Sequence, residues 1–121
     1  MSGIEVSSEQ VRITAVPIPA GATGLSAGIN LGKGRIARID VPAGWVAGVM
    51  TIAVSSDAGA TYLPLFNADG TEYTLNVASG RATLVPLIDL LSVQWVQLRS
   101  GTSATPINQT GAPIINVVTA P

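Results

Sequence analysis

Glycine and proline recur at short intervals along the whole chain, and this spacing limits the fold more than any other feature of the sequence. The 121 residues include 13 glycines and 8 prolines. These two residue types interrupt helices, whereas they are common in the turns between short strands. Most polar side chains are Ser, Thr, Asn or Gln, which suit strands and turns. The sequence therefore predicts an all-β fold.

Alternation of apolar and polar residues locates the strands. In the segment 49–55 (VMTIAVS), Met50, Ile52 and Val54 place the larger apolar side chains on one face, as in a half-buried strand. Further strands are predicted at 11–15, 36–41, 62–66, 72–77, 81–84, 93–98 and 114–118. A total of about eight strands without amphipathic helices between them indicates a two-sheet antiparallel sandwich or a jelly roll.

The connections between these strands read as turns and loops. Residues 56–61 (SDAGAT) join the two strands of a hairpin, and the pair 69–70 (DG) supplies the positive φ angle of a second tight turn. Residues 86–91 (PLIDLL) predict a loop with local helix, and residues 99–112 predict a long polar loop. The chain is thus expected to reverse direction repeatedly over short distances.

The first part of the chain is less regular, but it gives no sign of a second domain. Segment 16–34 is rich in Gly, Pro and Ala and fits either an extended arm or a meander. Residues 1–10 are a candidate for a flexible arm or for a strand exchanged with a neighbouring subunit. We therefore expect one β-sandwich domain over residues 1–121.

Charged residues are scarce in this chain. They make up 11% of it, less than half of the roughly 25% that is usual in soluble domains. Seven acids and six bases are scattered and give a net charge of −1, which argues against nucleic acid and anionic membrane as partners. The low charge suggests that partner subunits cover much of the surface. We therefore expect a homo-oligomer, with a trimer as one candidate state.

The sequence predicts neither a membrane-spanning segment nor a signal peptide. No apolar stretch reaches the ~20 residues that are needed to span a bilayer. Residues 1–10 are polar and acidic, unlike the basic start and apolar run of a signal peptide. We therefore expect synthesis in a cytoplasm.

The inventory of reactive side chains is small. Because the chain has no His and no Cys, Ser-His-Asp triads, Cys-His pairs and most zinc sites are impossible. Asp57 and Asp69 stand in turns, where an Asp side chain bonds its own backbone. Residues 67–72 carry oxygen side chains before a glycine but lack the twelve-residue spacing of a calcium loop. We expect no catalytic, metal or cofactor site, and a hydrolase that acts through carboxylates stays as the enzymatic hypothesis.

Five aromatic residues raise the possibility of sugar binding, because exposed rings can stack on sugars. Tyr62 and Phe66 share one face of a predicted strand, since they are an even number of residues apart. Trp45 lies between two predicted strands and is the candidate for an exposed ligand contact. Trp95 alternates with Val93 and is expected in the core. A glycan is therefore an alternative partner, with Trp45, Tyr62 and Phe66 as its ligand residues.

Three stretches resemble a group of small tailed-bacteriophage and prophage virion proteins. They are 42–45 (PAGW), 50–72 (MTIAVSSDAGATYLPLFNADGTE) and 93–109 (VQWVQLRSGTSATPINQ). The resemblance begins at Arg35, and its most specific part is Arg99-Ser100-Gly101-Thr102 followed by Pro106, Asn108 and Gln109. Residues 1–34 match nothing in this group.

The resemblance implies a non-enzymatic component of the virion. A capsid decoration (cement) protein that binds the major capsid protein on the capsid surface is the first expectation, and a tail or fibre component is the second. Arg99 is the candidate interaction residue. It ends a predicted strand, and its guanidinium could contact a neighbouring subunit or hold the loop that follows it.

Overall fold

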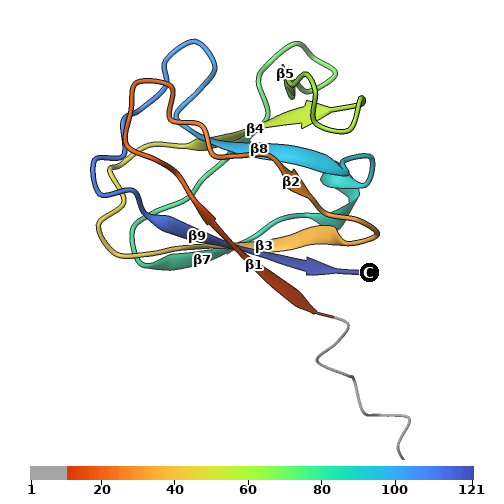
Figure 1. Cartoon of the computed structure of the whole chain (residues 1–121), viewed down its shortest axis with the longest axis horizontal. Coiled ribbons are helices and arrows are strands. Elements are labelled where there is room, and N and C mark those ends of the chain that lie inside the picture. The colour runs from red at the N-terminus through yellow and green to blue at the C-terminus, as the bar shows by residue number, and fades with distance from the viewer. Residues whose placement is uncertain (1–10) are drawn as a thin grey trace, which may run out of the picture.

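The computed structural model describes residues 11–121, which form two antiparallel sheets packed face to face (Figure 1). The four-stranded sheet has the order β1-β9-β3-β7. Its strands are β1 (Arg12–Pro17), β9 (Ile114–Ala120), β3 (Arg35–Val41) and β7 (Arg81–Leu84). The first and the last strand described are therefore neighbours, and β9 lies between β1 and β3.

The five-stranded sheet has the order β2-β8-β4-β5, with β6 also paired to β4. Its strands are β2 (Ile29–Asn30), β8 (Trp95–Ser100), β4 (Met50–Ser55), β5 (Leu63–Pro64) and β6 (Thr74–Leu75). The helix η3 (Leu87–Leu90) follows β7 and forms the local helix expected in residues 86–91. The predicted all-β antiparallel sandwich is confirmed.

The core lies between the sheets and follows from side-chain alternation. On β4, Met50 and Ile52 are fully buried, as the alternation in the sequence predicts. Thr51 and Ala53 on the other face are buried as well, so the prediction of a half-buried strand is wrong. On the facing sheet, Ile39 of β3 pairs with Val117 of β9, and both are fully buried. Removal of these side chains from water supplies the main driving force for packing the sheets together.

Strand β1 presents its more apolar face to the outside. Thr14 and Val16 point toward the core, whereas Ile13 and Ala15 are exposed. Register decides this, because Thr14 pairs with the buried Val117 of β9 and Ile13 pairs with the outward-facing Val118. The strand therefore contributes little to the core and leaves apolar side chains in solvent.

Two strands are much shorter in the structure than the sequence predicts. The segments 62–66 and 72–77 contain only the two-residue strands β5 and β6. Pro64 lies in β5 and has no N–H to donate to a ladder. The turn at 67–70 then reverses the chain, with Gly70 N–H bonded to the carbonyl of Asn67.

Segment 16–34 crosses from one sheet to the other. After β1, Leu25 forms a bridge with Arg99, and Ser26 N–H donates to Leu98 O of β8. Strand β2 then continues along β8. The segment is thus neither a free arm nor a separate meander. The arm proposed for residues 1–10 lies outside the described residues.

Within residues 11–121, no helix has the length and apolar character of a membrane-spanning segment.

Candidate functional site

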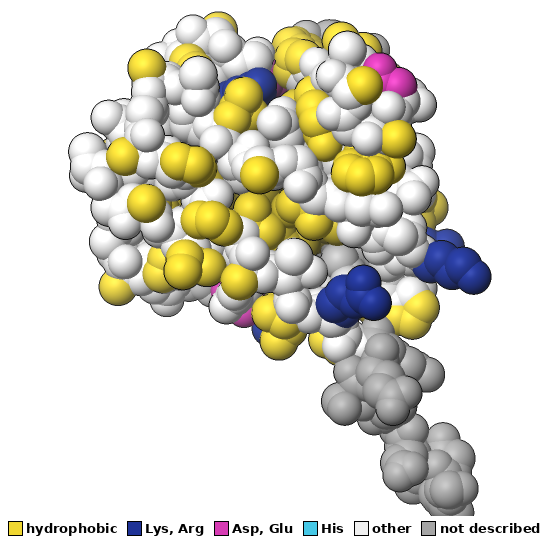
Figure 2. Space-filling model, viewed as in Figure 1, with side chains coloured by type: hydrophobic (Ala, Val, Ile, Leu, Met, Phe, Trp, Pro, Cys, Tyr) yellow, Lys and Arg dark blue, Asp and Glu magenta, His cyan; other side chains and the backbone are white. Residues whose placement is uncertain are grey.

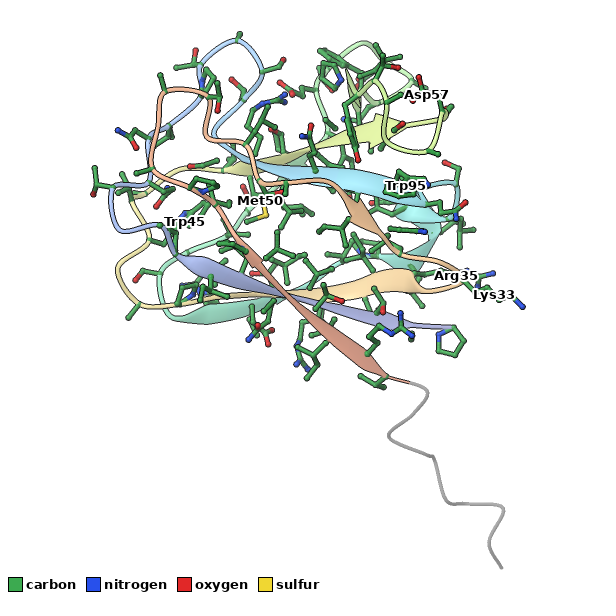
Figure 3. All side chains as sticks on the ribbon, viewed as in Figure 1. Lys33, Arg35, Trp45, Met50, Asp57 and Trp95 are labelled. Carbon is green, nitrogen blue, oxygen red and sulfur yellow. The ribbon has the colours of Figure 1, made fainter. Side chains whose placement is uncertain are left out.

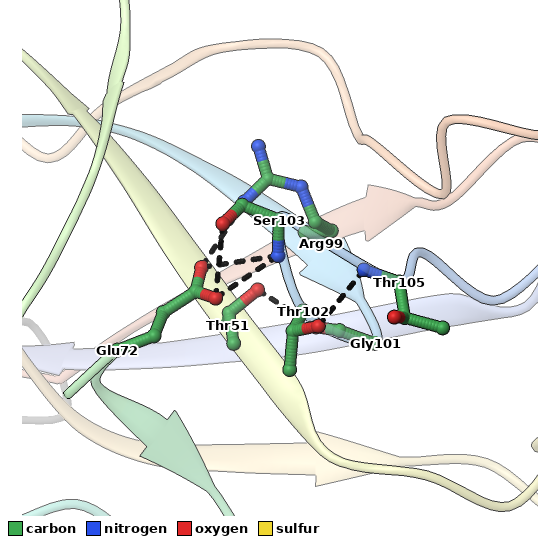
Figure 4. A network of polar contacts seen from close by, with 7 residues as sticks. All are labelled: Thr51, Glu72, Arg99, Gly101, Thr102, Ser103 and Thr105. Carbon is green, nitrogen blue, oxygen red and sulfur yellow. Dashed lines mark hydrogen bonds and ion pairs between the residues drawn. The ribbon is translucent and has the colours of Figure 1, made fainter.

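Arg99, the candidate interaction residue, faces Glu72 in a buried ion pair at one end of the five-stranded sheet (Figure 4). Its Nη1 atom lies 3.5 Å from Glu72 Oε2, and each of the two side chains is 10% exposed. Glu72 also accepts hydrogen bonds from the Ser103 N–H and hydroxyl, both at 3.0 Å. Burial of either charge alone would be strongly unfavourable. Glu72 thus links Arg99 of β8 to Ser103 in the loop that follows this strand.

That loop, residues 101–109, is fixed by further short-range bonds. Thr51 of β4 donates its hydroxyl to Gly101 O at 2.7 Å, and Thr105 N–H donates to Thr102 Oγ1 at 3.0 Å. Gly101 has a φ angle of 83°. A Cβ atom there would lie 2.5 Å from Thr105 O and 2.8 Å from Ile107 N. Only glycine fits this close approach without strain.

Gln109 connects the same loop to the segment that carries Trp45. Its side chain is fully buried. Oε1 accepts from Val46 N–H at 2.8 Å, and Nε2 donates to Val46 O at 2.9 Å and to Ser100 Oγ at 2.8 Å. The neighbouring Asn108 accepts from Gly21 N–H through Oδ1 at 2.8 Å. Asn108 and Gln109 thus tie separate segments of the chain together.

Trp45 is buried, so the prediction that it is an exposed ligand contact is wrong. Its side chain is 5% exposed and belongs to the hydrophobic core (Figure 3). The indole N–H donates to Gly48 O at 3.3 Å. Gln109 holds the backbone of Val46 against the body of the protein, and this bond turns the preceding ring inward.

The other tryptophan also differs from expectation. Trp95 is only half-buried and lies outside the main hydrophobic core. It packs over the hairpin turn, where its ring carbons would lie 3.1 Å and 3.3 Å from a Cβ atom on Gly59. Tyr62 adjoins the same turn, and its hydroxyl occupies the space that a side chain at Gly28 would need. Tyr62 therefore packs against glycine backbone, and its hydroxyl points toward Gly28.

Phe66 is the aromatic ligand candidate with a large exposed area, at 50%. It borders a hollow of about 230 Å³ that Tyr73 and Asp89 also line. The Tyr73 hydroxyl donates to Asp89 Oδ2 at 2.9 Å. Partial burial, together with this carboxylate, raises the pKa of Tyr73 to about 12. The structure therefore does not bring Trp45, Tyr62 and Phe66 together into one aromatic platform.

The turn carboxylates bond to their own turns, as the sequence predicts. Asp57 accepts from the Ser55 hydroxyl and from the Thr61 N–H and hydroxyl, which lowers the pKa of Asp57 to about 2. Asp69 accepts from the N–H and hydroxyl of Thr71 in the same way. Across residues 11–121, the acidic side chains form no group of three that could hold a metal ion.

The outer face of the four-stranded sheet is apolar and was not recognised from the sequence. Strand register places twelve side chains on it: Ile13, Ala15, Pro17, Ile114, Asn116, Val118, Ala120, Arg35, Arg38, Asp40, Ala82 and Leu84. Leu84 is 80% exposed, Ile13 60% and Ile114 56%. Alternation within β1 gives a signal for this face, but only the pairing with β9 shows which side is outward.

Two charges near the centre of this outer face pair with each other, and Arg35 lies at one end of the face. Arg38 Nε donates to Asp40 Oδ1 at 2.7 Å, and this bond raises the pKa of Arg38 above its ordinary value. Elsewhere, Figure 2 shows small groups of basic side chains, and Figure 3 places Lys33 and Arg35 at one end of the sheets. Scarce charge on a flat apolar sheet is typical of a surface that contacts another protein.

Replacement of Gly101 by alanine is expected to destabilise the fold strongly. The positive φ angle costs about 1–3 kcal/mol for a residue other than glycine, and the Cβ atom would also clash with Thr105 O. Gly70→Ala is the matched control, because its φ is 90° but nothing lies within 4 Å. Urea unfolding should show a clearly larger loss of stability for Gly101→Ala. Equal losses would mean that the loop moves aside to accept the side chain.

Stability is expected to fall between about pH 10 and pH 12 because of Tyr73. The folded protein holds this phenolic proton more tightly than the unfolded chain, whose pKa is near 10. The stabilising contribution is therefore complete below pH 10 and is lost as the pH rises through 12. Tyr73→Phe should flatten this part of the stability curve. An unchanged slope between pH 10 and 12 in Tyr73→Phe would contradict the assignment.

The described residues thus contain two candidate sites, the loop network around Arg99 and the outer face of the four-stranded sheet. No family model, no curated protein and no solved structure matches this chain.

Proposed function

We propose that this chain is a non-enzymatic structural protein of a tailed-bacteriophage or prophage virion, and that it acts as an oligomeric decoration protein on the major capsid protein. The observation that carries the proposal is the apolar outer face of the four-stranded sheet, with its single ion pair between Arg38 and Asp40. The virion role itself rests on the resemblance of residues 42–45, 50–72 and 93–109 to virion proteins.

A decoration protein has to bind many identical sites on a symmetric shell. A face of this kind suits that task, because apolar area supplies binding free energy without the desolvation cost of unpaired charges. Arg38 and Asp40 neutralise each other at 2.7 Å and therefore leave no uncompensated charge at the centre of the face. The low charge of the whole chain, 11% of residues, agrees with a protein whose surface is covered in an assembly.

The loop network around Arg99 contributes rigidity in this proposal. Glu72, Ser103 and Gln109 hold long polar segments in one arrangement. Binding to a shell then costs little further ordering of the chain, and preorganisation of this kind increases affinity. In this proposal Arg99 supports the shape of the protein.

A second candidate is a tail or fibre component that recognises glycans. The half-exposed ring of Phe66, beside the hollow lined by Tyr73, favours it. The burial of Trp45 removes the larger ring from this site. Binding on a glycan array that disappears with Phe66→Ala would favour this candidate, whereas flat signals would remove it.

Co-sedimentation with capsids of the phage or prophage that encodes the chain tests the decoration proposal. The double variant Leu84→Glu, Ile114→Glu places charges on the outer face. It should weaken binding at least about tenfold, since burial of each apolar side chain against the shell contributes more than about 1.4 kcal/mol. Both side chains are exposed, so the variant should unfold at nearly the same urea concentration as the original chain.

Leu63→Glu is the matched control for this experiment. Leu63 is also exposed, but it belongs to β5 of the other sheet. It should leave capsid binding unchanged. Unaltered binding by the double variant would exclude the outer face as the contact surface. Absence of binding by the original chain would overturn the decoration proposal.

A further inference from the structure

Strand β1 is an unusually open edge. Within residues 11–121 it pairs only with β9, through six residue pairs from Arg12↔Thr119 to Pro17↔Ile114. The opposite edge of the same sheet, β7, has four residues, and the edge strands β2 and β5 have two each. Short edge strands are a common protection against unwanted pairing. The edge formed by β1 lacks this protection.

The residues of β1 do not protect it either. Natural edges carry inward-pointing charges, lysines, prolines or bulges that prevent another strand from adding to them. In β1 the one charge is Arg12 at the start, and the one proline is Pro17 at the end. Between them lie Ile13, which is exposed, and the small residue Ala15. The strand therefore offers unpaired backbone groups and exposed apolar area along the same edge.

We propose that β1 pairs in antiparallel fashion with β1 of a second copy, so that two four-stranded sheets join into one continuous sheet across a two-fold axis. The inference rests on the proposed function, for which it names the contact between subunits. A strand edge is complementary to itself in the antiparallel sense, and a two-fold axis brings identical surfaces together. A second copy of the chain is therefore the partner that this edge can bind through its unpaired backbone groups.

The charge distribution favours an antiparallel partner. Arg12 is the one charged residue of β1 and stands at its first position. Antiparallel pairing with Ala15 opposite Ala15 of the second copy keeps the outward side chains of both copies on one face. It separates the two copies of Arg12 by roughly 20 Å, at ~3.3 Å per residue. Parallel pairing in register would place these like charges side by side, which is unfavourable.

Pairing through β1 would double the area of the outer face that is available for binding. Four strands about 4.8 Å apart and about 20 Å long offer roughly 400 Å², whereas a stable protein interface buries about 800 Å² on each partner. One copy therefore presents about half of the area that stable binding requires. Two copies joined at β1 present the full area as one surface, with Ile13 of both copies near its centre.

Single cysteine substitutions test the pairing directly, because the chain has no cysteine of its own. Ile13→Cys and Ala15→Cys place a thiol on β1, while Leu84→Cys and Ile114→Cys place one on other strands of the same face. Mild oxidation of the full chain should give a disulfide-linked dimer with Ala15→Cys, whose thiol faces its own copy across the two-fold axis, and with neither control. A disulfide needs Cβ atoms about 4 Å apart, so the cross-link reports the strand edge itself.

Hydrogen exchange on the unmodified full chain provides the second measurement. Amides of β1 should exchange more slowly at high protein concentration than at low concentration, and those of β7 should not change. Cross-linking through Leu84→Cys alone would overturn the β1 pairing. A chain that stays monomeric at every concentration and still binds capsids would also overturn it, and would leave the decoration proposal intact. A β1-linked dimer that binds no capsid would support the pairing and overturn the decoration proposal.

Discussion

The buried carboxamide of Gln109 is the interaction on which the end of the sandwich depends. An amide without partners is costly inside a protein, whereas this one has three hydrogen bonds, two to the backbone of Val46 and one to Ser100. Because these bonds fix the segment before β4, Trp45 packs into the core. The ion pair of Arg99 and Glu72 holds the same loop at another point, because Glu72 also accepts hydrogen bonds from Ser103. The two contacts together hold residues that are far apart in the sequence.

Local sequence patterns were sufficient to predict much of the sandwich. The predicted strand at 49–55 is β4 (Met50–Ser55), and the one predicted at 81–84 is β7. Both are correct because alternation and turn residues act over a few positions. The alternation in β1 was equally visible, but its outward side depends on the register with β9, which lies about a hundred residues away. Register between distant strands is not encoded in either strand alone.

The candidate sites were less predictable for the same reason. Arg99 could be selected from its position at a strand end, but its partner Glu72 belongs to a different hairpin. Trp45 was misplaced because the bond that turns it inward comes from Gln109, 63 positions from Val46. Tyr62 and Phe66 share a face only if a regular strand joins them, and that strand is reduced to Leu63–Pro64. Each of these contacts is a consequence of tertiary structure.

The central place of β9 also affects how the molecule can be made. This strand is the last one that the structure describes, yet it lies between β1 and β3. While the chain emerges from the ribosome, β1 has no partner and β3 can pair only with β7, so the four-stranded sheet cannot close until residues 114–120 are free. Folding that depends on such distant pairings is slow, and it leaves unpaired apolar strands open to aggregation. Efficient production of this protein would therefore favour rapid completion of the chain or assistance from a chaperone.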